Sequence, residues 1–137
     1  GFSRTYTTRP DGGTYGGMLP LYPPGGWPVQ HFAGLQVSAD SRVNLGFFNG
    51  DHGRAVTSRV TLYDAEGRKV AERTLTLASL ASRQRELLRF FDLDALPEGT
   101  YGLTVLPLDD PETGDQGRSW AYVSVVDNRT HDPVNLW

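Results

Sequence analysis

The side chains most often used in catalysis and metal binding are few in this chain and widely spaced. Its three histidines are His31, His52 and His131, and each lies in a different segment that we expect to be a turn or loop. No pair of them has the spacing of metal ligands on one helix or strand. A copper or zinc site would need them to converge in space, so a solvated histidine is the simpler interpretation of each.

Carboxylates are concentrated in one segment, Asp109–Asp115. Calcium takes oxygen ligands from acidic loops, but the alternating Asp-x-Asp-x-Asp-Gly pattern of a calcium-binding loop is missing here. We therefore predict a solvated loop and no cofactor, with calcium at this loop as the alternative. The acidic residues concerned are Asp109, Asp110, Glu112 and Asp115.

The motifs of common enzyme classes are missing as well. Gly-x-Ser-x-Gly does not occur, and the segment Gly117–Trp120 does not match it. Cysteine is absent, which excludes a thiolate nucleophile, a cysteine-ligated zinc and disulfides. Glycoside hydrolysis needs two carboxylates that face one groove, and nothing in the sequence singles out a pair. We expect that the protein is not an enzyme, with a small metal-assisted enzyme as the weaker alternative.

Aromatic side chains are the feature of the sequence with the most potential for binding. In the strand expected near the C-terminus, Trp120 and Tyr122 alternate with small and β-branched residues and so share one face. If they point outward, beside Tyr63 on the neighbouring strand, they form a flat row that can stack on sugar rings. The interpretation that we favour is that the Pro-rich N-terminal segment covers this face through Trp27 or Tyr22.

Length and composition indicate one β-rich domain. The chain has 137 residues, of which 16 are Gly and 9 are Pro, and 38% are hydrophobic. This mixture is typical of many short strands joined by tight turns. The net charge of −3 provides no basic field of the kind that nucleic acid requires, and no apolar stretch has the length of a membrane-spanning helix. We expect neither nucleic acid nor a membrane span.

Alternating apolar residues predict a series of short strands from about residue 32 onwards. Residues 78–91 are ambiguous, because a helical stripe of leucines competes with a polar strand, and we favour a strand over 83–90. The whole pattern predicts an all-β fold, an antiparallel immunoglobulin-like β-sandwich of about seven strands. The other expected features are strands at 43–47, 56–63, 70–77, 100–108 and 119–127, a hairpin turn at 64–67 and a bulge near Glu72.

Residues 1–28 differ in character from the rest, and we interpret them as an extended Pro/Gly-rich arm that precedes a β-sandwich domain over 29–137. Phe2–Thr7 has the alternation of a strand, whereas the prolines and glycines after it disfavour helix and interior strand. Such an arm can pair within its own domain, which we favour, or add as a strand to an exposed edge of another copy. The contact residues that we expect in the arm are Phe2, Arg4, Tyr6, Tyr15 and Trp27.

Three segments together resemble a β-sandwich module that occurs, often in tandem, in secreted and cell-surface proteins of bacteria. They are Arg42–Asn49, Leu62–Gly67 and Ala121–Pro133. The arm also resembles the segment that precedes the module in such proteins, through Ser3–Tyr6 and Gly13–Gly16. The resemblance implies an immunoglobulin-like or fibronectin-like fold, a secreted or cell-surface location and a structural or adhesive role; it nominates no active residues.

We therefore expect a non-enzymatic, extracellular structural or assembly module that makes its contacts through strand edges and the N-terminal arm. Its partners would be copies of itself or neighbouring modules, as in a surface polymer or filament. The alternative is a carbohydrate-binding module that presents Trp120, Tyr122 and Tyr63 to a polysaccharide.

Overall fold

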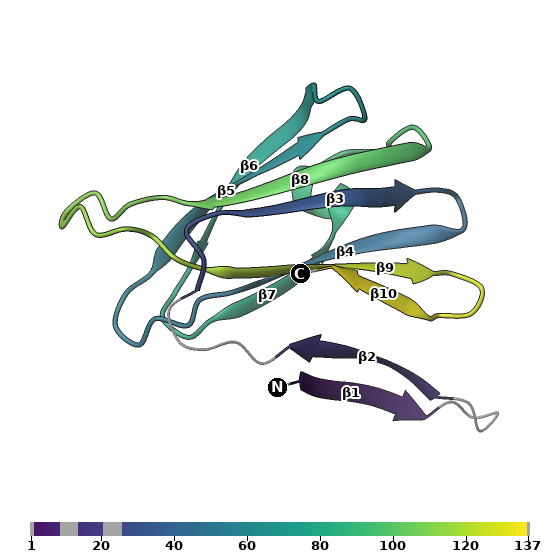
Figure 1. Ribbon diagram of the computed structural model, residues 1–137, viewed down its shortest axis with the longest axis horizontal. Helices are drawn as coiled ribbons and strands as arrows, with labels where there is room; N and C mark the ends of the chain where they lie inside the picture. The colour runs from purple at the N-terminus through teal and green to yellow at the C-terminus, as the bar shows by residue number, and fades with distance from the viewer. Residues whose placement is uncertain (1, 9–13, 21–25, 137) are drawn as a thin grey trace.

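The fold is an antiparallel β-sandwich, as the sequence pattern predicts. The computed structural model in Figure 1 describes residues 2–8, 14–20 and 26–136. One sheet has the order β10–β9–β4–β7, formed by Pro133–Leu136, Trp120–Asp127, Ser41–Phe48 and Ser82–Glu86. The other has the order β3–β8–β5–β6, formed by Gln30–Val37, Gly99–Pro107, Val56–Tyr63 and Lys69–Leu77.

The core lies between the two sheets and is supplied by alternate residues of each strand. β4 contributes Val43, Leu45 and Phe47, and β5 contributes Val60 and Leu62. All five are buried, as the predicted alternation requires. Burial of one such side chain stabilises the folded state by about 1.5–3 kcal/mol, so the alternating pattern is the main energetic reason for this architecture.

Two local hydrogen bonds hold the turn between β5 and β6 and the start of β8. The predicted hairpin turn joins β5 to β6, where Gly67 has a φ of 79° and Asp64 Oδ1 accepts a hydrogen bond from the backbone N–H of Arg68 at 2.9 Å. At the start of β8, Tyr101 Oη donates to the carbonyl oxygen of Pro97 at 2.8 Å. A tyrosine that bonds back to the chain just before its own strand is a hallmark of immunoglobulin-like sandwiches.

The ambiguous segment before β8 is part strand and part helix. β7 ends at Glu86, and the short helix α1 follows directly as Leu87–Phe91. Leu87, Phe90 and Phe91 are buried, because a spacing of three and four residues places them on one side of the helix. The predicted strand over 83–90 is therefore right as far as Glu86 and wrong beyond it.

The structure differs from the prediction at three other places. The register of β5 with β6 shifts where Leu62 lies opposite Ala71 and Tyr63 opposite Lys69, so the bulge is at Val70 instead of Glu72. The segment 30–37 is a strand, β3, that we did not predict in full. A further strand that was not predicted, β10, follows the strand expected at 119–127 and pairs with it. The start of β10 at a proline fits the rule that a strand tolerates proline in its first position.

The N-terminal arm contains a β-hairpin. β1, Phe2–Thr8, confirms the predicted strand, and it pairs along its whole length with β2, Thr14–Pro20. β2 was expected to be irregular because of its glycines and its proline, but Pro20 is its last residue and leaves the ladder intact. Figure 1 shows the hairpin beside the sandwich, where β2 lies alongside β10. No helix in the described ranges is long and apolar enough to cross a membrane.

Candidate functional site

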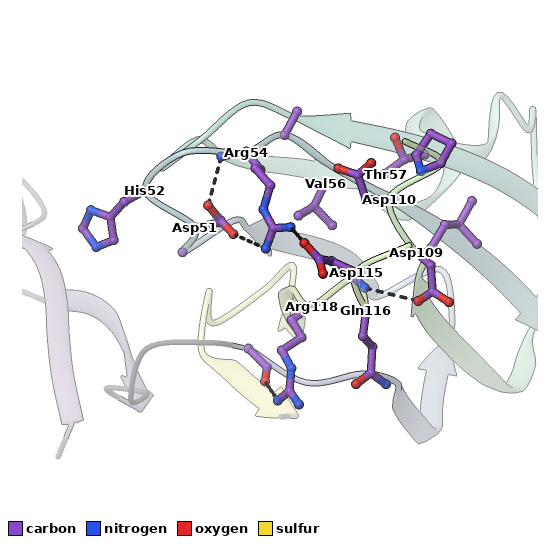
Figure 2. A pocket seen from close by; sticks show the side chains of 16 residues that line it. Asp51, His52, Arg54, Val56, Thr57, Asp109, Asp110, Asp115, Gln116 and Arg118 are labelled. Carbon is purple, nitrogen blue, oxygen red and sulfur yellow. Dashed lines mark hydrogen bonds and ion pairs between the residues drawn. The ribbon is translucent and has the colours of Figure 1, made fainter. Parts of the chain in front are cut away.

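A hollow of about 390 Å³ lies at one end of the sandwich. Figure 2 shows it between two loops, residues 49–55 after β4 and residues 108–118 after β8. The backbone of Gly26 closes a third side, where its carbonyl oxygen accepts a long hydrogen bond of 3.4 Å from Arg118 Nη1. The hollow is therefore the meeting point of three segments that are far apart in the sequence.

Arg54 joins the two loops electrostatically. Its guanidinium forms an ion pair with Asp115 across the hollow, and Nη2 lies 3.4 Å from Asp51 Oδ2 of its own loop. Figure 2 shows both carboxylates pointing toward the guanidinium, whereas His52 points away from it. The hydrogen bond to Asp115 raises the pKa of Arg54, which therefore stays charged. Exposed ion pairs of this kind contribute little to the free energy of folding, although they place Arg54 between the two loops.

Two carboxylates of this hollow, Asp51 and Asp110, accept hydrogen bonds from backbone N–H groups of their own loops. Asp51 Oδ1 accepts hydrogen bonds from the backbone N–H groups of Gly53 and Arg54 at 2.8 and 2.9 Å. Asp110 Oδ1 does the same in the second loop, at 2.8 and 3.1 Å. Backbone hydrogen bonds are the largest cause that lowers the pKa of each group below its ordinary value of 3.8. Both groups therefore remain ionised near neutral pH, and neither suits the role of a general acid.

The acidic residues of the loop that was considered for calcium do not converge on one point. Asp109 Oδ1 accepts a hydrogen bond from the backbone N–H of Gly117 at 3.3 Å, and Asp115 is paired with Arg54. Across residues 2–8, 14–20 and 26–136, no group of three acidic or histidine side chains is arranged to hold a metal ion. The geometry agrees with a solvated loop that is held by hydrogen bonds between its own carboxylates and backbone N–H groups. The absence of any cofactor stays a prediction.

The three histidines lie on separate elements. His31 belongs to β3 instead of a loop, and its Nδ1 is 3.1 Å from Thr104 Oγ1 of β8. His52 lies in the loop after β4, and His131 lies in the turn between β9 and β10 with a φ of 61°. The structure therefore does not bring them together.

Asn49, whose role the sequence pattern does not reveal, positions the first loop. Its side chain is fully buried, and Nδ2 approaches the carbonyl oxygens of Arg54, Leu77 and Ala78 at 2.8, 3.2 and 3.1 Å. Its Oδ1 accepts a hydrogen bond from the backbone N–H of Asp51 at 2.9 Å. Asn49 thus ties the loop after β4 to the end of β6. In the sequence, Asn before Gly has the appearance of an ordinary turn.

Trp120 is buried beneath the N-terminal segment. The ring of Trp27 packs edge-on against it, with centroids 6.0 Å apart and an interplanar angle of 80°. The backbone N–H of Trp27 also donates to the carbonyl oxygen of Ser119 at 3.0 Å. The predicted packing of Trp27 on Trp120 is therefore seen in the structure; Tyr22 lies outside the described residues.

Tyr63 does not extend the aromatic side chains of β9 into a row. The ring of Tyr122 lies over Gly46 of the neighbouring strand, so close that a Cβ at that position would be 1.9 Å from Tyr122 Cε1. Burial raises the pKa of the Tyr122 hydroxyl. Tyr63 belongs to β5 in the opposite sheet, so its predicted place beside β9 was wrong. The exposed aromatic side chains near Trp120 are instead Trp27 and Phe48.

The other predicted contact residues lie on the hairpin. Phe2, Arg4 and Tyr6 belong to β1 and Tyr15 belongs to β2, where it lies opposite Thr7. Their side chains are outside the described part of the structure. The backbone brings all four to one two-stranded element, which Trp27 follows at the start of the sandwich.

Comparison with known proteins identifies no relative: no family model, curated protein or solved structure matches this chain.

Proposed function

We propose that this protein is an extracellular structural module that assembles with copies of itself through the free edge of β1. The observation that carries the proposal is the position of the hairpin. β2 lies alongside β10, the edge strand of one sheet, and β1 has a second edge to which no described strand pairs. A two-stranded hairpin is only marginally stable in water, so a third strand on β1 would stabilise it.

The other edges of the sandwich carry features that oppose strand addition. β7 is short and exposes Arg83 and Arg85, and β6 carries a bulge at Val70. β3 is interrupted between Phe32 and Leu35, where its register with β8 shifts. Charges, short length and bulges are the means by which natural sheets avoid edge-to-edge association. β1 has seven residues, no proline and a single charged side chain, so it carries fewer of these features, and this favours it as the contact edge.

The test compares two adjacent proline substitutions in β1, Thr5→Pro and Tyr6→Pro. Neighbouring N–H groups of a strand point to opposite edges, so one substitution blocks the free edge and the other disrupts pairing with β2. Sedimentation velocity over a range of concentrations should show dimers or larger species for the full chain, and a monomer for the variant with the blocked edge. A full chain that stays monomeric at every concentration would contradict the proposal.

A carbohydrate-binding role is the second candidate, and it rests on different residues from those first expected. Trp27 is 51% exposed and Phe48 is 40% exposed, and both lie next to the buried ring of Trp120. Exposed aromatic rings of this kind stack on the apolar faces of sugars. Titration with neutral polysaccharides should change the tryptophan fluorescence of the wild type, and Trp27→Ala should abolish the change. An unchanged spectrum with every polysaccharide tested would argue against stacking.

A further inference from the structure

Four arginines converge on the open side of the sandwich, away from the hairpin and the end hollow. Arg73 comes from β6, Arg83 and Arg85 from β7, and Arg89 from α1, and together they line a cleft of about 300 Å³. β6 and β7 are the edge strands of opposite sheets, so the cleft lies where the two layers part.

Three of these arginines occupy positions that face the core in the rest of their sheets. Arg83 lies opposite Phe47, and Arg85 lies opposite Leu45, both of which are buried core residues of β4. Arg73 lies opposite the buried Val60 of β5. Because side chains on facing positions share one side of a sheet, these arginines point into the gap between the layers. Each of the three is nevertheless exposed.

The guanidinium groups are poorly neutralised. Arg89 Nε lies 3.8 Å from Glu86 Oε2, and Arg73 Nη1 donates to the carbonyl oxygen of Phe90 at 2.6 Å. Arg83 and Arg85 form neither an ion pair nor a hydrogen bond with any residue in the described part of the chain. Glu86 is the one carboxylate in the described part of the chain that forms an ion pair with any of these four arginines, so the four cations repel one another, although the protein as a whole has a net charge of −3.

The cleft has a shape and chemistry suited to anions. Its floor includes the buried side chains of Leu75 and Phe90, and an apolar floor strengthens the electrostatic interactions of charges above it. Arg83 and Arg85 are two residues apart on one strand, which separates their Cα atoms by about 7 Å. Guanidinium groups at this separation can share one oxyanion or hold two adjacent ones, each through paired N–H donors.

We infer that this arginine cleft binds a compact polyvalent oxyanion, a molecule with two or more adjacent phosphate or sulfate groups. A ligand of this class supplies the negative charge that the described residues do not. Its source can be a small phosphate compound or the sulfate groups of a polysaccharide, which present the same chemistry. The inference does not depend on how the protein assembles.

The test is calorimetric titration of the full chain with tripolyphosphate and, separately, with a short sulfated dextran. Neutral dextran and sodium chloride of matched ionic strength serve as blanks. The double variant Arg83→Gln/Arg85→Gln removes the two guanidinium groups that pair with no described residue. The matched control Arg59→Gln/Arg129→Gln removes the same charge from two other exposed positions. Circular dichroism confirms that each variant is folded.

We expect saturable binding of at least one probe by the wild type, a loss of affinity of at least tenfold in the cleft variant, and a change of less than twofold in the control. Binding of tripolyphosphate alone would identify a phosphate ligand, and binding of sulfated dextran alone a sulfated polysaccharide. Equal losses in the two double variants, or no saturable binding of either probe, would overturn the inference.

Discussion

Replacement of the buried amide of Asn49 gives the sharpest test of how the end of the sandwich is built. The Asn49 side chain supplies two N–H donors to three carbonyl oxygens and accepts one backbone hydrogen bond. Asn49→Ala removes these hydrogen bonds and leaves the carbonyl group of the buried Leu77 without its amide donor. Each lost bond costs about 0.5–1.5 kcal/mol, and a buried acceptor without a donor costs about 1–3 kcal/mol. Four lost bonds and one unsatisfied acceptor sum to about 3–9 kcal/mol, so we expect the free energy of unfolding to fall by at least about 3 kcal/mol.

Asn49→Asp removes the N–H donors of the side chain but keeps its shape, so it tests the two contributions separately. The introduced carboxylate keeps the volume and can still accept from Asp51, but it places oxygen against three carbonyl oxygens. Burial raises the pKa of a carboxyl group, so its folded-state pKa lies above its unfolded-state value. Stability is therefore largest below the unfolded pKa and is lost as pH rises through the folded pKa. The stability deficit of this variant should therefore grow as the pH rises above the unfolded pKa of Asp, about 3.9.

Urea denaturation followed by circular dichroism measures both effects. The matched control is Asn44→Ala on the same strand, whose side chain is half-buried and which should lose less than about 0.5 kcal/mol. A loss of less than about 1 kcal/mol for Asn49→Ala would refute the account of Asn49 as the tie between β4 and β6. A deficit for Asn49→Asp that does not depend on pH would refute the argument from carboxylate burial.

Gly46→Ala should lower the free energy of unfolding by about 1–3 kcal/mol, because the added Cβ collides with the Tyr122 ring. The loss should be much smaller in a Tyr122→Ala background. Urea denaturation of the wild type, the two single variants and the double variant measures this coupling as a double-mutant cycle. Tyr101→Phe should cost about 1 kcal/mol through loss of the hydrogen bond to Pro97, measured as a lower Tm, and an unchanged Tm would contradict this role. Backbone hydrogen bonds lower the pKa of several turn carboxyl groups, Asp127 among them, below the ordinary value of 3.8. The stability that these groups contribute is therefore complete above that value and is lost as the pH falls through the folded-state pKa. Urea denaturation midpoints should stay level near neutral pH and decrease below about pH 4, and the decrease should be less steep in Asp127→Asn.

The sheet layers were predictable because alternation along a strand is a local property. Val43, Leu45 and Phe47 appear in the sequence as one face of a strand, and they form one face of the core. The turn at 64–67 was predictable for the same reason, since an Asp and a Gly suffice to close it. The change from strand to helix after Glu86 was harder, because apolar residues with helical spacing follow a polar strand without any break.

The candidate sites depend on long-range pairing, which local patterns do not specify. The sequence alone determined which residues of each strand share a face, and therefore the all-β class and much of the core. Only the tertiary structure decided that Tyr63 is remote from Trp120, that Asn49 is a buried tie, and that the arginines of β6 and β7 meet across one cleft. The physical reason is that the alternation of a strand fixes the direction of its side chains, whereas its neighbours are chosen by contacts between residues distant in the chain.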